Sequence, residues 1–418
     1  MKKLLIAVLC LMLTGCAAPA PSDGSGPDRS VSPDIPAPSP AASSAPNGES
    51  GPPQASPETD PETAENPSAS QEPSESSLGP QNQEQIIQEL LSAMTLEEKV
   101  GQMFFVRCPE TGGAELAAQY KVGGYLLFGR DFKDKTAQQV RDDIQSYQDA
   151  SGIPLLIGTD EEGGTVVRAS SNPDLFPQRE PAPQTLFAQG GMDLILQDAR
   201  QKSMTLLDLG VNVNFAPVAD VSTDPADFIY ARSFGQDAQA TANYVAQVVG
   251  VMGEEQIGFV LKHFPGYGNN VDTHTGIALD QRPYETFQTS DFLPFQAGIQ
   301  AGADAVLVSH NIAASMDESL PASLSPTVHK ILREELGFDG VVLTDDLAMD
   351  AVMEYAQNGS AAVLAIQAGN DMVVTTDFQT QIPQVIHAVQ SGVIAESQID
   401  QAVTRVLNWK YELGLLGN

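Results

Sequence analysis

Eight short apolar stretches alternate with segments of helical periodicity along most of this chain, and this alternation constrains the fold more than any other feature. The apolar stretches have the length of buried strands and lie at residues 102–106, 123–128, 154–159, 211–216, 258–261, 305–309, 340–344 and 371–375. The helical segments lie at residues 136–150, 192–209, 240–252, 292–301, 326–336, 361–369, 382–390 and 396–413. Strands that alternate with helices predict a parallel sheet.

Eight strand–helix units favour a closed (β/α)8 barrel over an open, doubly wound sheet. Dinucleotide-binding examples of the open sheet carry a GxGxxG motif at the first strand–helix turn, and the glycine pairs at 123–124 and 163–164 lack its spacing. A segment of about 335 residues, 84–418, suits a single barrel. We therefore predict one α/β domain, a (β/α)8 TIM barrel, over residues 84–418.

The first sixteen residues have the features of a secretory signal. Two lysines precede a short apolar run, residues 4–13, which is shorter than the roughly 20 residues that span a bilayer. The run ends in Leu-Thr-Gly-Cys at 13–16, which resembles a lipobox, where the cysteine is lipidated and becomes the mature N-terminus. We expect residues 1–16 to be the signal and Cys16 to carry a lipid that anchors the chain to a membrane outside the cytoplasm. The alternative is an ordinary signal peptide with an incidental cysteine.

The composition of residues 17–83 predicts a disordered linker. This segment holds 15 of the 29 prolines of the chain, together with many serine, glutamate and glycine residues. It has too little apolar surface to offset the entropy of ordering, and proline-rich, like-charged segments stay extended. We expect it to hold the barrel away from the membrane.

Charge and cysteine content exclude several classes of function. A formal net charge of −33 leaves no basic surface to neutralise phosphates, so we expect no nucleic-acid partner. Of the three cysteines, only Cys108 would remain free in the mature chain, where its apolar neighbours predict a buried small side chain. Histidine and cysteine do not recur at metal-ligand spacing. We expect no metal or organic cofactor, and we expect a monomer.

Polar side chains gather where the predicted strands end. In chain order they are Asp160, Glu161, Glu162, Arg168, Asn214, Asp220, Arg232, Lys262, His263, Asp272, His274, His310, Asp345 and Asp346. The loops at the carboxyl ends of the strands build the active site of a (β/α)8 barrel. These side chains are therefore predicted to meet at one end of the domain.

Five motifs at these positions resemble glycoside hydrolase family 3, and within it the β-N-acetylglucosaminidase branch. They are DEEGG at 160–164 with Arg168 behind it, ARSFG at 231–235, KHFPG at 262–266, Asp-Thr-His at 272–274 and TDDLAM at 344–349. The resemblance covers the whole of 84–418. It implies a carbohydrate substrate and a retaining enzyme that removes terminal β-linked N-acetylglucosamine from cell-wall (peptidoglycan) fragments.

The resemblance also implies roles for individual residues. Asp345 takes the position of the family's nucleophile, which forms a covalent glycosyl intermediate. His274, paired with Asp272, takes the position of the proton donor, and an imidazole pKa of about 6.5 suits proton transfer in both directions. The residues that match the family's sugar-binding positions in the −1 subsite are Asp160, Arg168, Arg232, Lys262 and His263.

Several of these assignments have alternatives. Asp346 is a weaker candidate for the nucleophile than Asp345, because adjacent strand residues point to opposite faces. Arg168 and Arg232 could instead form ion pairs with the acidic residues at 160–161. His310 could line the pocket, or it could be a satisfied buried histidine.

The chain departs from the family pattern in places, and two rival functions remain open. Tyr267 stands where histidine is common, Thr165 stands where arginine is frequent, and the loop to Asp272 is about one residue shorter than usual. We expect these changes to affect the choice of leaving group more than the reaction itself.

The two rival functions are another enzyme of the same fold, either a β-glucosidase or a phosphorylase, and a catalytically inactive sugar-binding lipoprotein.

Overall fold

Eight parallel strands form one sheet in the computed structural model, which describes residues 80–270, 278–349, 352, 355 and 360–417. The order of the strands in the sheet is β10-β1-β2-β3-β4-β5-β7-β9. The strands are β1 (Phe104–Arg107), β2 (Gly124–Leu127), β3 (Leu156–Thr159), β4 (Val213–Asn214), β5 (Gly258–Phe264), β7 (Ala305–Val308), β9 (Val341–Thr344) and β10 (Val373–Thr375). Each apolar stretch of the sequence overlaps one strand, so the predicted (β/α)8 barrel is confirmed.

The two ends of this sheet meet. The backbone N–H of Thr344, at the end of β9, donates to the carbonyl oxygen of Met372 at 3.3 Å, and the N–H of Val374 in β10 donates to the Thr344 hydroxyl at 3.0 Å. Strand β10 then pairs in parallel with β1. Closure leaves no unpaired edge in this sheet and brings the carboxyl ends of its eight strands to one end of the barrel.

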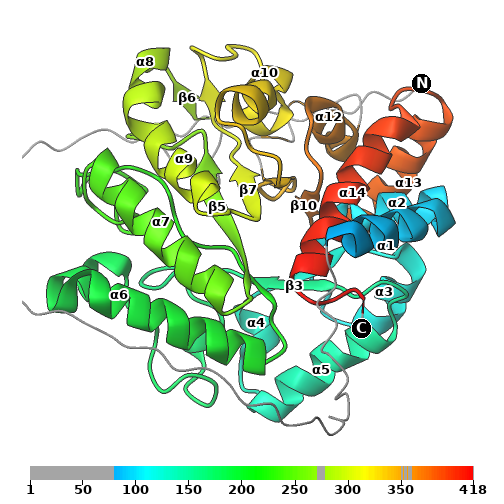
Figure 1. The fold of residues 1–418 in the computed structure, drawn as a ribbon, viewed down its shortest axis with the longest axis horizontal. Coiled ribbons are helices and arrows are strands. Elements are labelled where there is room, and N and C mark those ends of the chain that lie inside the picture. Colours follow the sequence, from blue (N-terminus) through cyan, green and yellow to red (C-terminus); the bar gives the residue numbers. More distant parts are fainter. Residues whose placement is uncertain (1–79, 271–277, 350–351, 353–354, 356–359, 418) are drawn as a thin grey trace, which may run out of the picture. The chain divides into compact units, whose positions relative to one another are not determined.

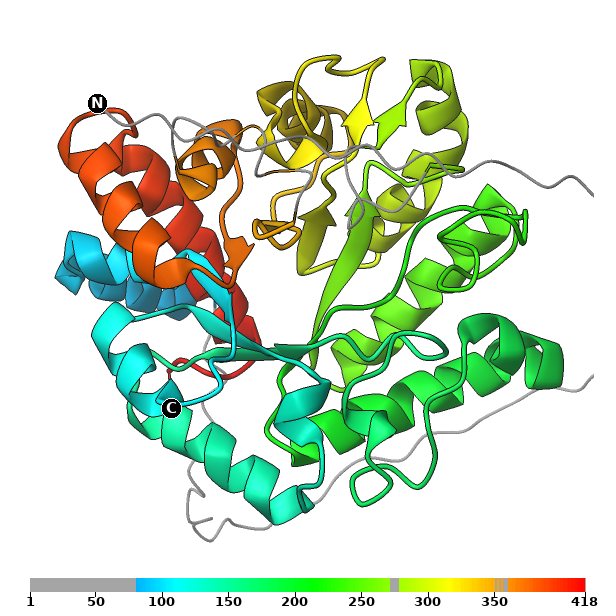
Figure 2. The ribbon, with the colours of Figure 1, turned by 180° about the vertical axis from the view of Figure 1, so that it is seen from behind.

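Helices surround the strands (Figure 1), and the reverse view shows the same ring (Figure 2). They are α1 (Pro80–Ala93), α2 (Leu96–Gln102), α3 (Gly113–Tyr120), α4 (Gly129–Phe132), α5 (Ala137–Asp149), α6 (Pro183–Asp208), α7 (Ala238–Glu254), α8 (Tyr284–Thr286), α9 (Phe292–Gln300), α10 (Pro326–Lys330), α12 (Ala361–Ala368), α13 (Phe378–Gln390) and α14 (Glu396–Glu412). Each helical segment of the sequence corresponds to one of them. Helix α6 begins earlier than the sequence pattern indicates. It consists of two parts joined by a bend at Gly191 (φ 67°), a conformation that glycine tolerates, and the predicted segment 192–209 matches only the second part.

Shorter elements complete the described chain. A two-stranded sheet of β6 (Leu279–Asp280) and β8 (Ile312–Ala313) lies outside the barrel sheet. The remaining labelled elements are two short 3-10 helices, η1 (Ala169–Ser171) and η4 (Ala322–Leu324), and two short π-helices, η3 (Phe287–Asp291) and η5 (Ile331–Glu335).

The side chains of each strand alternate between the barrel interior and the layer of helices. Phe104 packs in the outer core against the helices, whereas Phe105 packs inside the barrel, as the period of two along a strand requires. Trp409 of α14 belongs to the inner cluster. At Gly158 a Cβ atom would lie 2.7 Å from the Phe215 ring, so aromatic rings already fill that level of the interior. The space for a ligand is left at the carboxyl ends of the strands.

The N-terminal region bears on the predicted domain boundaries. Helix α1 begins at Pro80, slightly before the predicted start of the barrel domain at residue 84, and proline is favoured at the first position of a helix. The predicted signal, Cys16 and most of the linker lie outside the described residues. In the part of the chain that the structure covers, no helix combines the length and apolar character needed to cross a bilayer.

Cys108 is 1% exposed, as predicted, and burial raises the pKa of its thiol to about 12.

Candidate active site

One cavity of about 280 Å³ lies where the barrel strands end, and it collects most of the predicted site residues. Its walls are formed by Arg107, Leu126, Phe128, Asp160, Glu162, Val166, Arg168, Phe215, Arg232, Lys262, His263, Leu307, Asp345, Asp346, Met349 and Val374. The structure thus brings together the predicted nucleophile and all five predicted sugar-binding residues. The predicted proton donor His274 and its partner Asp272 lie outside the described residues.

Lys262 occupies the centre of a buried network of opposite charges. Its Nζ lies 2.6 Å from Asp160 Oδ1 and 2.6 Å from Glu162 Oε1. The Arg232 guanidinium binds the same Glu162 carboxylate through two nitrogens, at 3.0 Å and 2.7 Å. Burial by itself would raise the pKa of Glu162, but the positive charges of Arg232 and Lys262 outweigh burial and hold that pKa well below its usual range. The network therefore fixes charged donors and acceptors along one wall of the cavity.

Glu161 is next to these carboxylates in the sequence, but its side chain anchors the backbone of a loop. It is fully buried and accepts the backbone N–H groups of Arg168 at 2.9 Å and Ala169 at 2.8 Å, and the Ser170 hydroxyl at 2.5 Å. These bonds anchor the loop that carries Arg168, whose guanidinium lies 3.5 Å from Asp160. The ion pair of Arg168 is thus made with Asp160 rather than with Glu161.

The imidazole of His263 is oriented by a buried carboxylate. Asp220, only 1% exposed, lies 2.8 Å from His263 Nδ1 and also accepts the backbone N–H groups of His263 at 3.0 Å and Tyr267 at 2.8 Å. The other ring nitrogen, Nε2, lies 3.0 Å from a guanidinium nitrogen of Arg232. Because arginine only donates, Nε2 accepts this bond and Nδ1 donates to Asp220. Asp220 thereby sets the tautomer of His263.

The two consecutive residues Lys262 and His263 both face the cavity, which regular strand alternation would not allow. The pairing register between β5 and β7 shifts between Leu261 and Phe264, and a register shift of this kind re-aims side chains. The peptide bond between Lys262 and His263 is cis. The sequence indicated both residues for the site, but the irregularity that turns both inward is visible only in the structure.

Tyr267, one of the departures from the family pattern, does not line the cavity. Its side chain is 1% exposed, and its ring packs edge-on against His263 with the centroids 5.2 Å apart. It also contacts the Phe228 ring at 5.7 Å. Tyr267 therefore packs against the imidazole of His263 and helps to hold it in place.

Asp345 and Asp346 follow β9 directly. The backbone N–H of Asp345 donates to the Val308 carbonyl at 3.0 Å, which extends the pairing with β7 by one residue. Asp345 Oδ1 accepts the backbone N–H of Asp346 at 2.8 Å, and Asp346 Oδ1 accepts that of Ala348 at 2.9 Å. The carboxylate of Asp346 is thus engaged in holding the turn after the strand.

The expectation that strand alternation would separate these two aspartates is wrong. Both side chains line the cavity, because β9 ends at Thr344 and neither residue lies within the regular strand. Burial raises the pKa of Asp346, and the neighbouring charge of Asp345 acts in the same direction.

His310 is the satisfied buried histidine of the two alternatives. It is fully buried, with Nδ1 2.7 Å from the Ser323 hydroxyl and Nε2 3.0 Å from the carbonyl oxygen of Asp346. It does not belong to the cavity wall. Its contacts hold the backbone of the Asp345–Asp346 turn.

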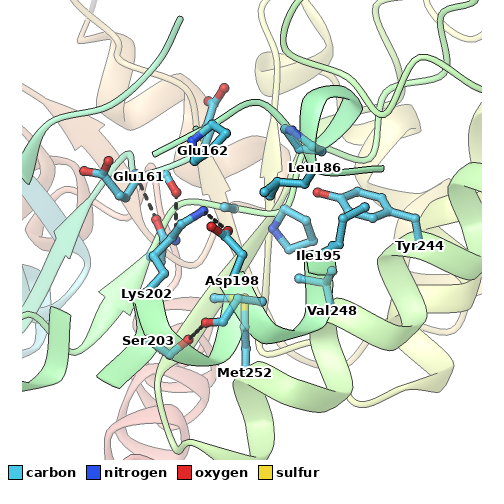
Figure 3. A pocket seen from close by; sticks show the side chains of 16 residues that line it. Glu161, Glu162, Leu186, Ile195, Asp198, Lys202, Ser203, Tyr244, Val248 and Met252 are labelled. Atoms are coloured by element: carbon cyan, nitrogen blue, oxygen red, sulfur yellow. Dashed lines mark hydrogen bonds and ion pairs between the residues drawn. The ribbon is translucent and has the colours of Figure 1, made fainter. Parts of the chain in front are cut away.

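A second, much smaller cavity of about 30 Å³ lies beneath the segment that carries the acidic run. Figure 3 shows Lys202 and Asp198, both of α6, below Glu161 and Glu162. Lys202 Nζ lies 3.1 Å from Asp198 and 3.6 Å from Glu180, and burial raises the pKa of Glu180 to about 8. This cavity has room for little more than a water molecule and belongs to the support of the active-site wall.

Three charged residues at the site, Glu162, Asp220 and Arg107, had no predicted role. Glu162 belongs to the same acidic run as Asp160, and its position at the strand end was a sufficient signal. Asp220 lies farther from its strand, and only the contact with His263 reveals its part. Arg107 is the last residue of β1, so the rule that strand ends carry the site applied to it as well.

Comparison with known proteins agrees with this geometry. Residues 95–409 match the N-terminal domain of glycosyl hydrolase family 3. A β-hexosaminidase of Stenotrophomonas maltophilia (strain R551-3) is 35% identical over 318 residues, which cover 73% of this chain and 89% of that protein.

Solved structures give the same result. A glycoside hydrolase family 3 β-N-acetylglucosaminidase from Paenibacillus sp. str. FPU-7 superposes with a TM-score of 0.71 at 30% identity, over 78% of this chain and 64% of that chain. A β-N-acetylhexosaminidase from Beutenbergia cavernae DSM 12333 superposes with a TM-score of 0.65 at 30% identity, over 75% of this chain and 98% of that chain. The family match extends over most of the barrel and includes every described residue of the charge network. The chain therefore belongs to glycosyl hydrolase family 3 and is a glycoside hydrolase that acts on O-glycosyl bonds.

Proposed function

We propose that this chain is a retaining exo-β-N-acetylglucosaminidase that removes terminal β-linked N-acetylglucosamine from peptidoglycan fragments. The observation that carries the proposal is the presence of Asp345 in the same cavity as the network of Asp160, Glu162, Arg232 and Lys262. The names of the relatives, β-hexosaminidase and β-N-acetylglucosaminidase, support the sugar assignment.

The cavity suits one terminal sugar. Its volume of about 280 Å³ is close to the lower end of the range for ligand pockets, about 300–1,000 Å³, which favours a single ring over a longer chain. Neighbouring hydroxyl groups of a sugar each donate and accept hydrogen bonds. The carboxylate of Asp160 accepts such bonds, and the ammonium of Lys262, 2.6 Å from it, donates them. This pairing suits a sugar ring held in the cavity that Asp345 also lines.

The reaction then proceeds in two displacements. In the first, an Asp345 carboxylate oxygen bonds to the anomeric carbon, the bond to the leaving oxygen breaks, and His274 gives that oxygen a proton. In the second, His274 takes a proton from water, the water oxygen bonds to the anomeric carbon, and the bond to Asp345 breaks. Two inversions at one carbon return the original configuration. Asp272 serves to orient the His274 imidazole and to favour its protonated form.

Replacing His274 by alanine should affect substrates according to their leaving groups. Phenyl β-N-acetylglucosaminide releases a basic phenolate and needs the proton, so we expect kcat/KM to fall by about 10²–10⁴-fold. The 2,4-dinitrophenyl glycoside releases a weakly basic anion, so its formation of the covalent intermediate should change by less than about tenfold. The measurement is pre-steady-state release of each phenol. Equal losses on both substrates would remove His274 from the role of acid.

The proposed function is tested by the substrates that the purified full chain cleaves. We expect hydrolysis of aryl β-N-acetylglucosaminide and not of aryl β-glucoside, at a rate indifferent to inorganic phosphate. Product analysis by NMR immediately after mixing should show the β-anomer of N-acetylglucosamine first. Preference for the glucoside would favour a β-glucosidase, and a phosphate requirement would favour a phosphorylase. Sugar binding without cleavage would favour a binding lipoprotein.

We also propose that Cys16 carries a lipid that anchors the enzyme to a membrane outside the cytoplasm. The Leu-Thr-Gly-Cys sequence and the short apolar run before it support this location. In cells that express the full chain, metabolic labelling with a fatty acid should mark the protein, and Cys16→Ser should lose both the label and membrane association. Retention of the variant in the membrane fraction at the wild-type level would contradict the anchor.

A further inference from the structure

Arg282 contacts the turn that follows β5, although the two displacements described above give it no part. Its guanidinium donates to the carbonyl oxygen of Gly266 at 3.3 Å. A Cβ atom on Gly268 would lie 2.4 Å from the guanidinium carbon, so the backbone of the turn packs directly on the cation. Gly268 has a φ of 53°, in the left-handed region that glycine tolerates. The turn therefore fits Arg282 closely because a glycine stands at the point of contact.

Arg282 also holds the short strand β6, where the described chain resumes after this turn. The Asp280 carboxylate at the end of β6 accepts the backbone N–H of Arg282 at 2.9 Å and a guanidinium N–H at 2.7 Å. Strand β6 pairs in parallel with β8, and the Ala314 N–H donates to the carbonyl oxygen of Asp280 at 2.9 Å. One guanidinium thus joins the turn at Gly266 to the strand at Asp280.

The guanidinium is itself fixed by a second carboxylate and by an aromatic ring. Asp291 in η3 accepts a guanidinium N–H with both oxygens, each at 3.0 Å, and the Phe287 ring centroid lies 4.4 Å from the guanidinium carbon. A Cβ atom on Gly266 would lie 2.4 Å from Asp291 Oδ1, so this carboxylate also packs against the turn. Because the donors of a guanidinium have fixed directions, these contacts define where the turn and β6 lie relative to each other.

The two points that Arg282 joins enclose the segment that carries the proposed proton donor. In the sequence, Asp272 and His274 lie between Gly266 and Asp280, and both are outside the described residues. Fixing the ends of a short segment reduces the number of conformations that the segment can adopt. A cation that served only to neutralise two carboxylates would not also have to bind the backbone of the turn.

We infer that Arg282 is a positioning residue for proton donation, which holds the two ends of the segment that carries His274 at a fixed separation. This inference rests on the proposed function, because it concerns the step in which His274 protonates the leaving oxygen. A general acid must lie within hydrogen-bond reach of the atom that it protonates, and a displacement of about 1 Å costs about a hundredfold in rate. Arg282 does not belong to the cavity wall, so it acts through the backbone and not on the substrate.

Substitution of Arg282 should therefore affect substrates according to their leaving groups. Arg282→Lys retains the charge without the forked donors, and we expect its kcat/KM for phenyl β-N-acetylglucosaminide to fall by roughly ten- to a hundredfold. Formation of the covalent intermediate from the 2,4-dinitrophenyl glycoside needs little protonation and should change by less than about threefold. Arg282→Met should widen this difference. The measurement is pre-steady-state release of each phenol by the full chain, below the unfolding temperature of each variant.

Gly268→Ala tests the same contact while every charge of the cluster stays in place. The added Cβ atom would lie 2.4 Å from the guanidinium carbon, so the turn and Arg282 must move apart. We expect the phenyl glycoside to be affected more than the 2,4-dinitrophenyl glycoside, as in Arg282→Lys. The matched control is Gly392→Ala, because Gly392 also has a positive φ (76°) but a Cβ atom there would meet nothing within 4 Å. This control should leave the ratio of the two rates unchanged.

Arg333→Met controls for a general loss of stability. Arg333 forms an ion pair with Asp371, which is 2% exposed, and donates to the carbonyl oxygens of Phe338 at 2.8 Å and Gly340 at 2.7 Å. These residues precede β9 and β10, so they lie at the end of the barrel opposite the active site. Arg333→Met should lower the stability of the protein and leave the ratio of the two rates unchanged.

The outcomes separate a positioning role from a purely structural one. An equal loss on both glycosides in Arg282→Lys and in Gly268→Ala would overturn the inference and leave Arg282 as a stabilising cation. A selective loss on the phenyl glycoside in Arg333→Met, equal to that in Arg282→Met, would also overturn it, because lower stability alone would then explain the effect.

Failure of the proposed function would look different. In that case the folded wild type would cleave neither glycoside, and amide hydrogen exchange would test the contact of Arg282 with the turn. Peptides that cover residues 266–282 should exchange at least about tenfold faster in Arg282→Lys than in the wild type, and at the wild-type rate in Arg333→Met. Such a difference would support the inference that Arg282 fixes the two ends of the segment. Unchanged exchange in Arg282→Lys would overturn it.

Discussion

Replacing Asp345 by asparagine should abolish turnover of aryl β-N-acetylglucosaminide while leaving the fold intact. An amide has the shape of the carboxylate but cannot form the glycosyl ester on which the two-step mechanism depends. We expect kcat to fall by about four orders of magnitude, equivalent to about 5.4 kcal/mol at about 1.36 kcal/mol per tenfold change. The side-chain oxygen of the introduced asparagine would still accept the Asp346 N–H, so the thermal midpoint of unfolding should stay close to that of the wild type.

The adjacent aspartate provides a matched control for this experiment. Asp346 lines the same cavity, but its carboxylate accepts hydrogen bonds from the turn that follows the strand. Asp346→Asn should therefore reduce activity far less than Asp345→Asn. In Asp345→Ala, added azide should restore part of the activity and give the glycosyl azide of inverted configuration, because an external nucleophile replaces the missing carboxylate. A larger loss in Asp346→Asn than in Asp345→Asn would move the nucleophile to the second aspartate.

Replacing Arg282 by methionine should cause a large loss of stability. Arg282 is shared by two carboxylates, Asp280 and Asp291, that are each 1% exposed. Its guanidinium lies 2.7 Å from Asp280 and 3.0 Å from Asp291, and it also donates to the carbonyl oxygen of Gly266 at 3.3 Å. Removing the cation that these two buried carboxylates share leaves their charges without its compensation. We expect the free energy of unfolding to fall by about 3–5 kcal/mol near neutral pH.

The cost of this substitution should depend on pH. Burial raises the pKa of Asp291 to about 7, although Arg282 opposes the shift, whereas an aspartate in the unfolded chain has a pKa of about 3.9. The folded state therefore binds the extra proton between these values. The stability that the Asp291 carboxyl group contributes is fully present below about pH 4 and is lost as the pH rises through about 7. Without the guanidinium the Asp291 carboxyl group gains a proton more readily, so Arg282→Met should cost less stability at about pH 5 than at about pH 8.

Urea unfolding at about pH 5 and about pH 8 measures both expectations for Arg282. Arg141→Met is the control, because it breaks an exposed ion pair with Asp208, and exposed pairs contribute about 0–1 kcal/mol. In a second variant, Asp291→Asn, the decline in stability between the two pH values should be smaller than in the wild type. A change of less than about 1 kcal/mol in Arg282→Met at both pH values would show that the two buried carboxylates do not need their cation.

Much of the fold follows from local patterns along the chain. The apolar stretches at 154–159 and 340–344 predict β3 and β9 because a strand buried on both faces needs an unbroken apolar run. Gly191 shows the limit of such patterns. It divides α6 into two parts, and the helical periodicity extends only to the second, so the helix start at Pro183 was not predicted. Boundaries of this kind depend on what the helix packs against.

The candidate site was likewise predictable as a set of residues but not as a set of contacts. The strand-end rule brought Asp160 and Lys262 into one site although 102 positions separate them in the chain. The strand-end rule did not indicate that Arg232 would form its ion pair with Glu162 rather than with Glu161, or that Asp220 would orient His263. These pairings depend on which neighbouring side chains face the cavity and which face the supporting layer.

The sequence by itself therefore determined the order of strands and helices, the barrel, and the end of the barrel at which the polar residues gather. Periodicity and strand-end position are local properties, and burial of apolar side chains imposes them directly on the chain. Only the tertiary structure decided the partners of each charge, the inward turn of both Lys262 and His263, and the position of the Arg107 guanidinium, whose Nε has no acceptor among the described residues. These features depend on distances between elements that are remote in the chain, and a difference of a few ångströms there determines which ion pairs form.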